Sequence, residues 1–335
     1  MGAHLAPGAA AGALKGKEQM RKGGVLSPVL GLSKGRRYWF NLLCAFVVAA
    51  LIGTAVVVIG LSYRSACNLV RPRRAPLTST PAEKGLSFEP VTFTSADGLR
   101  LAGWHIPSGN GATVILCHGL GTNRADMLPR AVLLAEHGYG SLLFDFRAHG
   151  ESEGEMVTYG YAETNDVLAA VDYLLARPDV DPQRIGILGG SLGAATAIRA
   201  AARSMHLKAV VVESAFTSLE DEIAFNFTAF SGLPPVPFAP LTVAFAQRQT
   251  GRRISEVRPI DDIPSISPRP VFIIHGTDDD TIPAEQGLRL YEAAGEPKEL
   301  WMVDGMGHES ALGVFPDEYE RSVIGFFDKS LGIDR

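Results

Sequence analysis

The sequence predicts an α/β domain built on a mostly parallel central sheet, with helices on both faces, a lid insertion and one preceding transmembrane helix. From residue 113 to residue 331, short runs rich in β-branched residues alternate with helical segments, as in a parallel sheet covered on both faces. Before them, Leu42 to Leu61 is a run of twenty residues without a charge. The 335 residues are 46% hydrophobic and 20% charged, enough for one large domain or two small ones.

The N-terminal part is interpreted as a tail, an anchor and a linker. Residues 1–37 are rich in Gly, Ala, Lys and Arg without an apolar period, which is typical of a disordered basic tail. Residues 38–63 are the predicted transmembrane helix, because the uncharged run can span a bilayer and aromatic residues flank it. The run is too long for a cleaved signal peptide, and no A-x-A site follows it. Residues 64–87 contain three prolines and are the predicted linker.

Basic residues flank the anchor unequally. Seven precede it, namely Lys15, Lys17, Arg21, Lys22, Lys34, Arg36 and Arg37, and four follow it, namely Arg64, Arg71, Arg73 and Arg74. The positive-inside rule therefore predicts a single-pass membrane protein with the tail in the cytoplasm and the large domain outside it.

The elements of the large domain follow in order. An antiparallel hairpin opens the domain, since "VTFTSADGLRLAGWHI" alternates around Asp97-Gly98. Further strands are predicted within 113–119, 140–150, 184–191, 208–214, 270–276 and 299–305, and helices near 125–137, 162–176, after 192, from 284 and at 316–331. The carboxyl ends of these strands carry the unusual residues, namely His118 to Gly121, Asp145, Ser191, Glu213, Asp278 to Asp280 and His308. Because chemistry in such sheets collects beyond the carboxyl ends, we expect the site there.

Ser191 stands between a predicted strand and a predicted helix. Gly189-Gly190-Ser191-Leu192-Gly193 satisfies G-x-S-x-G, the nucleophile-elbow pattern, in the context that the pattern requires. Side chains at 189 and 193 would collide with neighbouring backbone, and the helix behind the serine aims unpaired N–H groups at an oxyanion. The alternative is a serine that only caps the helix.

A serine nucleophile needs a base and an acid that orients the base. His308, in the glycine-rich "DGMGHES" after the last strand, is the predicted base. The other histidines lie in the tail, away from this edge, or before a glycine at a strand end, where they brace loops (His118, His149 and His275). The acid is one of the three consecutive carboxylates Asp278 to Asp280, and Glu213 is the rival.

Residues 88–331 resemble the α/β-hydrolase superfamily. The resemblance is carried by the elbow, by the chain order serine, acid, histidine, and by H-G-x-G-x-N-R, which reads His118-Gly119-Leu120-Gly121-Thr122-Asn123-Arg124. It is similar to membrane-anchored bacterial serine hydrolases and to a peptidase-like branch with the same motif.

The resemblance implies roles for particular residues. The pattern H-G-x-x-D places the acid on Asp279, with Asp278 or Asp280 as shifts of register. The N–H groups of Leu120 and Leu192 form the implied oxyanion hole. Arg147 and His149 belong to the scaffold.

A lid is predicted at about 218–266, because more than fifty residues separate two strands that need a far shorter connection. Its segment 223–245 carries five phenylalanines and four prolines, which either line an apolar pocket or pack the lid onto the domain. Asn226-Phe227-Thr228 is a weak match to a glycosylation sequon.

Several classes of function are excluded. A net charge of −5 with dispersed acidic residues does not fit a nucleic-acid binder, and no metal or nucleotide motif is present, so no cofactor or metal is expected. The three cysteines indicate no disulfide framework. We expect a serine hydrolase that cleaves a carboxylic ester or thioester through an acyl-enzyme. The alternatives are a serine peptidase or amidase and a non-catalytic scaffold. The expected partner is a small acyl-bearing substrate, with a lipid ester as a further hypothesis.

Overall fold

The computed structural model describes residues 34–308 and 310–334. The chain divides into two compact units, Met1–Gly53 and Thr54–Arg335, and the long helix α1 (Lys34–Val70) runs from the first into the second. Most of the predicted basic tail lies outside the described residues. Its last four residues, 34–37, are the first turn of α1.

Helix α1 is long and apolar enough to cross a membrane, by length and composition. It is longer than the predicted 38–63 at both ends. Its last turns stay helical because Ser62, Ser65, Ala66 and Val70 are buried within the second unit. The segment after Val70 is also fastened to the domain, since Arg74 donates hydrogen bonds to the carbonyl oxygens of the loop 149–154. The predicted linker 64–87 is therefore partly helix and partly a bound strap.

The sheet confirms the predicted fold class. In the part of the chain that the structure describes, eight strands form one sheet in the order β1-β2-β4-β3-β5-β6-β7-β8. The β1–β2 hairpin and the β2–β4 pair are antiparallel, and all other neighbours are parallel. The strands are β1 (Glu89–Thr94), β2 (Arg100–Ile106), β3 (Thr113–Cys117), β4 (Gly140–Phe144), β5 (Ile185–Gly190), β6 (Leu207–Glu213), β7 (Val271–Gly276) and β8 (Lys298–Val303).

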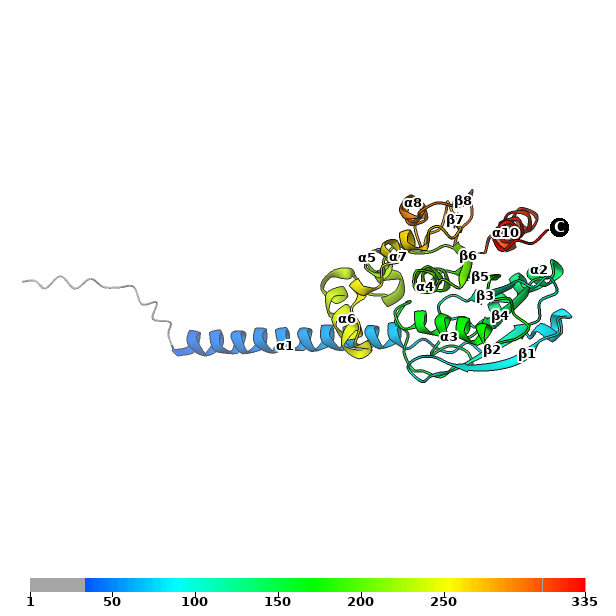
Figure 1. Ribbon diagram of the computed structural model, residues 1–335. Helices are drawn as coiled ribbons and strands as arrows, with labels where there is room; N and C mark the ends of the chain where they lie inside the picture. The colour runs from blue at the N-terminus through cyan, green and yellow to red at the C-terminus, as the bar shows by residue number, and fades with distance from the viewer. Residues whose placement is uncertain (1–33, 309, 335) are drawn as a thin grey trace, which may run out of the picture. The chain divides into compact units, whose positions relative to one another are not determined.

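Helices cover both faces of this sheet (Figure 1). Those that follow α1 are α2 (Leu128–Glu136), α3 (Glu163–Leu175), α4 (Leu192–Ala201), α5 (Leu219–Ser231), α6 (Pro235–Thr250), α7 (Pro259–Asp262), α8 (Ala284–Ala293), α9 (Ala311–Val314) and α10 (Pro316–Leu331). Short 3₁₀ turns are η1 (Pro81–Lys84), η2 (Arg124–Met127), η3 (Ile254–Glu256) and η4 (Ile263–Ile266).

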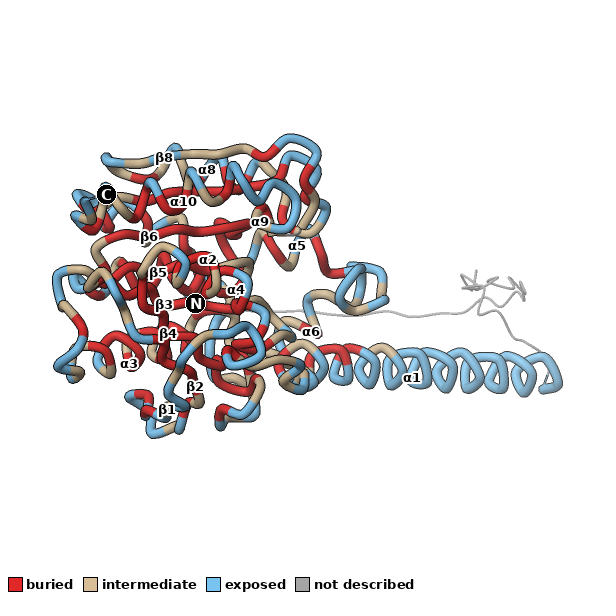
Figure 2. The backbone as a smooth tube through the Cα atoms, turned by 90° about the vertical axis from the view of Figure 1, so that its right-hand side faces the viewer, coloured by how far each residue is buried: buried red, intermediate tan, exposed pale blue. Residues whose placement is uncertain are grey.

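Two apolar cores sandwich the sheet, as the buried centre of Figure 2 shows. Residues of α3, α4 and α8 pack against one face, over Ile115 and Ile187 among others. Residues of α2 and α10 pack against the other face, over Leu116 and Leu188. Since adjacent strand residues point to opposite faces, this alternation explains why the strands are almost continuously apolar.

The segment between β6 and β7 folds into helices α5, α6 and α7 with η3 and η4. A smaller apolar cluster, which includes Ala195, Phe216 and Leu219, joins it to α4. Helix α4 begins at the turn that carries Ser191, so the inserted segment lies over the carboxyl edge of the sheet.

Candidate active site

Ser191 occupies a strained turn between β5 and α4. Its φ is 54° and its ψ is −118°, a backbone conformation that residues other than glycine rarely adopt. A Cβ atom at Gly189 would lie 2.4 Å from the Gly193 carbonyl oxygen, and one at Gly193 would lie 2.2 Å from that of Cys117. Both positions therefore require glycine, as the collision argument from the sequence predicts.

His308 lies between Ser191 and Asp279. Its Nε2 is 3.2 Å from the Ser191 hydroxyl oxygen, and its Nδ1 is 2.9 Å from Oδ2 of Asp279. Three segments far apart in the sequence, the β5–α4 turn, the β7–α8 loop and the β8–α9 loop, thus contribute one hydrogen-bonded row. A carboxylate, an imidazole and a hydroxyl in this order can transfer a proton from the hydroxyl.

Asp279 is held in place by backbone groups. Oδ1 accepts hydrogen bonds from the N–H groups of Thr281, at 3.0 Å, and Ile282, at 2.7 Å. Burial by itself would raise the pKa of Asp279, but the hydrogen bonds from His308 and Ile282 outweigh it, so the pKa lies below its ordinary value. Asp278 and Asp280 are exposed. Of the three carboxylates that the sequence left open, Asp279 is the one that contacts His308.

Glu213, the rival acid, is engaged elsewhere. Its carboxylate accepts two hydrogen bonds from Arg130, at 3.1 and 2.6 Å, and one from the Tyr319 hydroxyl. All three side chains are buried. Arg130 also donates to the Ser310 hydroxyl at 2.8 Å, close in the chain to His308. Glu213 thus belongs to a buried ion-pair network beneath the loop that carries the histidine.

This network gives a stability prediction. Arg130→Met leaves the Glu213 carboxylate buried without its cation, and we expect it to lower the free energy of unfolding by about 3–5 kcal/mol. The double variant with Glu213→Leu removes both charges and is expected to recover most of that loss. Urea unfolding of the detergent-solubilised full chain measures both. Equal destabilisation by the single and double variants would contradict the ion-pair explanation.

The predicted oxyanion loop lies against the serine. A Cβ atom at Gly119 would be 3.7 Å from Cβ of Ser191, so residues 119 and 120 border the elbow. Among the hydrogen bonds of the described residues, none comes from the Leu120 N–H. The Leu192 N–H is at the first position of α4, where a helix offers no internal acceptor. Both predicted donors are therefore at the edge of the elbow, and their role stays a prediction.

Two neutral histidines brace this loop. His149 Nε2 accepts a hydrogen bond from the Gly121 N–H at 3.1 Å, and His118 Nε2 accepts one from the Phe146 N–H at 3.0 Å. Burial lowers the pKa of His118 to about 3 and also lowers the pKa of His149. An imidazole that accepts a hydrogen bond cannot carry a proton on that nitrogen, so the lowered pKa values agree with the hydrogen-bond geometry.

The third histidine before a glycine, His275, contacts the Ile282 carbonyl oxygen at 2.7 Å. Arg147 forms a buried ion pair with Asp166.

A cleft of about 530 Å³ opens beside these groups. Its lining includes Leu120, Ser191, Ser214, His308, Arg130 and Leu312. The volume is that of a small-molecule site. Within the described residues, no group of His, Cys, Asp and Glu side chains could hold a metal ion.

The sequence does not single out Glu222 on α5, yet this carboxylate is buried near the site. Asn226 donates to its Oε1 at 3.0 Å, while its Oε2 has no hydrogen-bond partner. Burial raises the pKa of Glu222 to about 7, with the Asp279 charge adding to the effect and His308 opposing it. No sequence signal marks this residue, because its burial arises only when α5 docks onto the domain.

Glu222 makes stability depend on pH. The unfolded chain ionises this carboxyl near the ordinary pKa of 4.5, whereas the folded protein keeps its proton until about 7. Stability therefore falls as the pH rises through this window. We expect Glu222→Gln, which cannot ionise, to be more stable than the wild type by about 1–3 kcal/mol at about pH 8, and about equally stable near pH 4. Unfolding curves of both proteins at the two pH values measure this difference in stability. A difference of the same size at both pH values would contradict the raised pKa of the buried carboxyl.

The sheet order, the serine on the turn after β5 and the histidine after β8 define an α/β hydrolase. The chain belongs to the prolyl oligopeptidase family, whose model matches residues 129–334.

Relatives and a solved structure agree with this assignment. The uncharacterized protein YfhR of Salmonella typhi is 33% identical over 75% of this chain and 84% of its own length. The uncharacterized protein YqkD of Bacillus subtilis is 30% identical over 84% of this chain and 95% of its own. The esterase Pf2001 of Pyrococcus furiosus superposes with a TM-score of 0.68 at 31% identity, covering 78% of this chain and 98% of the esterase. The fold is therefore shared along nearly the whole length of an esterase.

Proposed function

We propose that the protein is a membrane-anchored serine hydrolase that cleaves a carboxylic ester or thioester through an acyl-enzyme intermediate. The observation that carries this proposal is the row of hydrogen bonds from Asp279 through His308 to Ser191. The strained elbow and the adjacent cleft support it, since they expose the hydroxyl to a substrate of moderate size.

The proposed reaction has two halves. In the first, His308 Nε2 accepts the proton of Ser191 as its oxygen bonds to the substrate carbonyl carbon. The N–H groups of Leu120 and Leu192 stabilise the oxyanion, and His308 then protonates the departing alcohol or thiol. In the second half, His308 takes a proton from water as the water oxygen bonds to the acyl carbon. The bond to Ser191 then breaks, His308 returns the proton to the Ser191 oxygen, and the acid is released. Asp279 stays ionised throughout and orients the imidazole, which its lowered pKa favours.

Two observations bear on the choice between ester and amide. The likeness to the Pyrococcus furiosus esterase extends over 98% of that chain and supports an ester. The family match supports peptide or amide cleavage as the second candidate. We favour the ester, because its alkoxide leaving group needs less assistance from a general acid than an amine does.

A pre-steady-state experiment tests the proposal. The detergent-solubilised full chain is mixed with a p-nitrophenyl ester and, separately, with the matched p-nitroanilide. We expect a burst of nitrophenol stoichiometric with protein, followed by slower turnover, and much slower release from the anilide. Release no faster than that of the Ser191→Ala variant would favour the non-catalytic scaffold, and faster anilide cleavage would favour the amidase.

The anchor is the second part of the proposal. Helix α1 carries the uncharged run, and the excess of basic residues before it supports a large domain outside the cytoplasm. Protease added to sealed vesicles of known orientation tests this topology. Protection of the domain in right-side-out vesicles would contradict it.

A further inference from the structure

Helix α6 packs alongside the C-terminal part of α1, within the second unit. Thr242 Oγ1 donates a hydrogen bond to the Ser62 carbonyl oxygen at 3.4 Å. Three residues further on, the Phe245 ring packs edge-on against the Tyr63 ring, with centroids 5.5 Å apart. Gln249 Oε1 then accepts hydrogen bonds from Cys67 Sγ at 3.5 Å and from Arg71 Nη1 at 3.1 Å. Residue numbers rise together along both helices. The two helices therefore run in parallel, side by side, over more than one turn.

This register fixes the level of the α5–α6 hairpin, residues 219–250. Helix α6 is kinked at Val236, and from Pro237 to Thr242 it advances by five residues, or about 7.5 Å of helix. Because the helices are parallel, the residues of α6 that precede Thr242 lie toward the residues of α1 that precede Ser62. In the second unit these are Thr54–Leu61, the end of the uncharged run. Figures 1 and 2 both show the hairpin projecting from the domain along this part of α1.

The projecting part is apolar and uncovered. No charged residue occurs from Ile223 to Gln247. Phe225, Phe230 and Val236 are 56%, 41% and 81% exposed. Helices α5 and α6 together are apolar enough for a membrane segment but are bent by 106° at their junction. An apolar lobe of this kind is unfavourable in water and marks an interaction surface.

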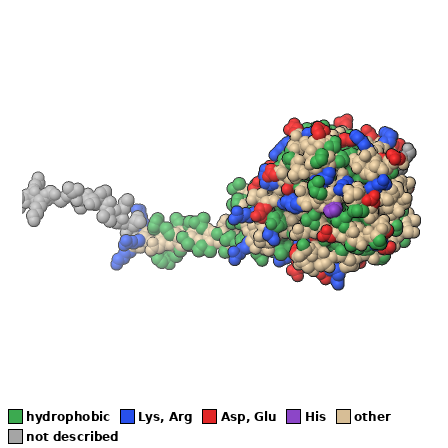
Figure 3. All heavy atoms as spheres, viewed as in Figure 1, with side chains coloured by type: hydrophobic (Ala, Val, Ile, Leu, Met, Phe, Trp, Pro, Cys, Tyr) green, Lys and Arg blue, Asp and Glu red, His purple; other side chains and the backbone are tan. Residues whose placement is uncertain are grey.

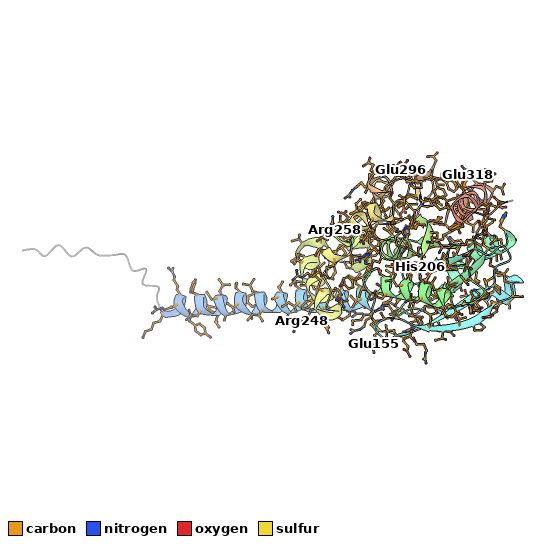
Figure 4. All side chains as sticks on the ribbon, viewed as in Figure 1. Glu155, His206, Arg248, Arg258, Glu296 and Glu318 are labelled. Atoms are coloured by element: carbon orange, nitrogen blue, oxygen red, sulfur yellow. The ribbon has the colours of Figure 1, made fainter. Side chains whose placement is uncertain are left out.

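Both helices change from apolar to basic at the same level. The uncharged stretch of α1 ends at Arg64, directly after Tyr63, and that of α6 ends at Arg248, three residues after Phe245. Arg252 and Arg253 follow, and all four arginines are exposed. Lys and Arg side chains gather on this edge of the domain in Figure 3, and Figure 4 shows Arg248 on α6 beside α1. Aromatic rings followed by arginines are the order found at the boundary between acyl chains and phosphate headgroups.

We propose that the α5–α6 hairpin is embedded in the bilayer that holds α1, and that the hydrolase acts on an acyl ester of a membrane lipid. Tyr63 and Phe245 lie at the interface, and the arginines lie at the level of the phosphates. An apolar cavity under the hairpin is lined by Leu69, Phe227, Phe230 and Val243, and also by Glu222, the carboxylate near His308. In this proposal the acyl chain enters the cavity from the hairpin. The substrate part rests on the proposed function, whereas the membrane contact does not.

Depth measurements test the contact. A fluorophore is attached at Val236→Cys in the full chain reconstituted in phospholipid vesicles, with Cys44 and Cys67 replaced by alanine and Cys117 left in place because it is fully buried. The matched control is Leu288→Cys on α8, which is 41% exposed and outside the hairpin. We expect lipids brominated in the acyl chain to quench the probe at 236 at least about twofold more than the probe at 288. Equal quenching by these lipids, with equal quenching by aqueous iodide, would overturn the contact.

Activity tests the substrate class. Val236→Asp places a charge on the embedded surface and is expected to slow turnover of a long-chain phospholipid ester in vesicles by about tenfold or more. Hydrolysis of the water-soluble p-nitrophenyl acetate is expected to stay at the wild-type rate, and Leu288→Asp is expected to change neither reaction. A Val236→Asp variant that hydrolyses both esters like the wild type would overturn the lipid substrate. A wild type that hydrolyses neither ester would overturn the proposed function, while the probes still decide the membrane contact.

Discussion

Replacing Ser191 with alanine is expected to reduce kcat for ester hydrolysis by roughly 10⁴- to 10⁶-fold while leaving the fold intact. The reason is that the hydroxyl oxygen forms the bond to the acyl group, and among the described residues Ser191 provides the hydroxyl that is hydrogen-bonded to His308. Alanine fits the elbow no worse than serine does, since both have a Cβ atom. Steady-state kinetics with circular dichroism of the same preparation measures both effects. A variant that keeps more than about a tenth of the wild-type kcat would require another nucleophile.

Replacing Asp279 with asparagine is expected to lower kcat by about 10⁴-fold. Asparagine keeps the shape of the side chain, but its amide cannot stabilise the imidazolium or hold Nδ1–H as the carboxylate does. His308 then loses the orientation in which Nε2 can accept the serine proton.

Asp278→Asn and Asp280→Asn are matched controls, because both side chains are exposed neighbours of Asp279. They are expected to keep activity close to that of the wild type in the same assay. If one of them instead loses activity while Asp279→Asn does not, the acid has been assigned to the wrong register.

The sheet could be predicted from the sequence because the strands β3 to β7 are short, largely apolar runs that end at, or directly before, a glycine or a polar residue. The strand predicted within 140–150 ends at Phe144, since Asp145 leaves the sheet to bind the Arg124 N–H and side chain. Such an ending depends on a partner more than twenty positions away in the chain. The local sequence pattern therefore cannot predict where this strand ends.

Part of the candidate site could be predicted from residue spacing in the sequence. Ser191 lies in a five-residue pattern whose glycines have one steric explanation, and His308 lies on the only suitable loop. The residues alone left the three aspartates and Glu213 as candidates for the acid. The choice of Asp279 depends on the N–H groups of Thr281 and Ile282, which become available only when the loop after β7 closes.

The remaining features are products of long-range packing. A hydropathy pattern assigns polar residues such as Ser62 and Ser65 to solvent. In the structure they are buried against the domain, and helix α1 continues to Val70. The lid composition indicated apolar contacts, but the parallel register of α6 on α1 follows from tertiary contacts alone. The same holds for Glu222, whose carboxylate is buried only in the assembled domain.

Mapping of a fluorophosphonate adduct by mass spectrometry decides whether Ser191 is the nucleophile. The full-length protein in detergent is treated with the probe and digested, and the modified residue is located in the peptide spectra. We expect one adduct, on Ser191, that is absent from Ser191→Ala and forms more slowly in Asp279→Asn. An adduct on another residue, or an unmodified folded protein beside a serine esterase that reacts in the same tube, would contradict the proposed mechanism.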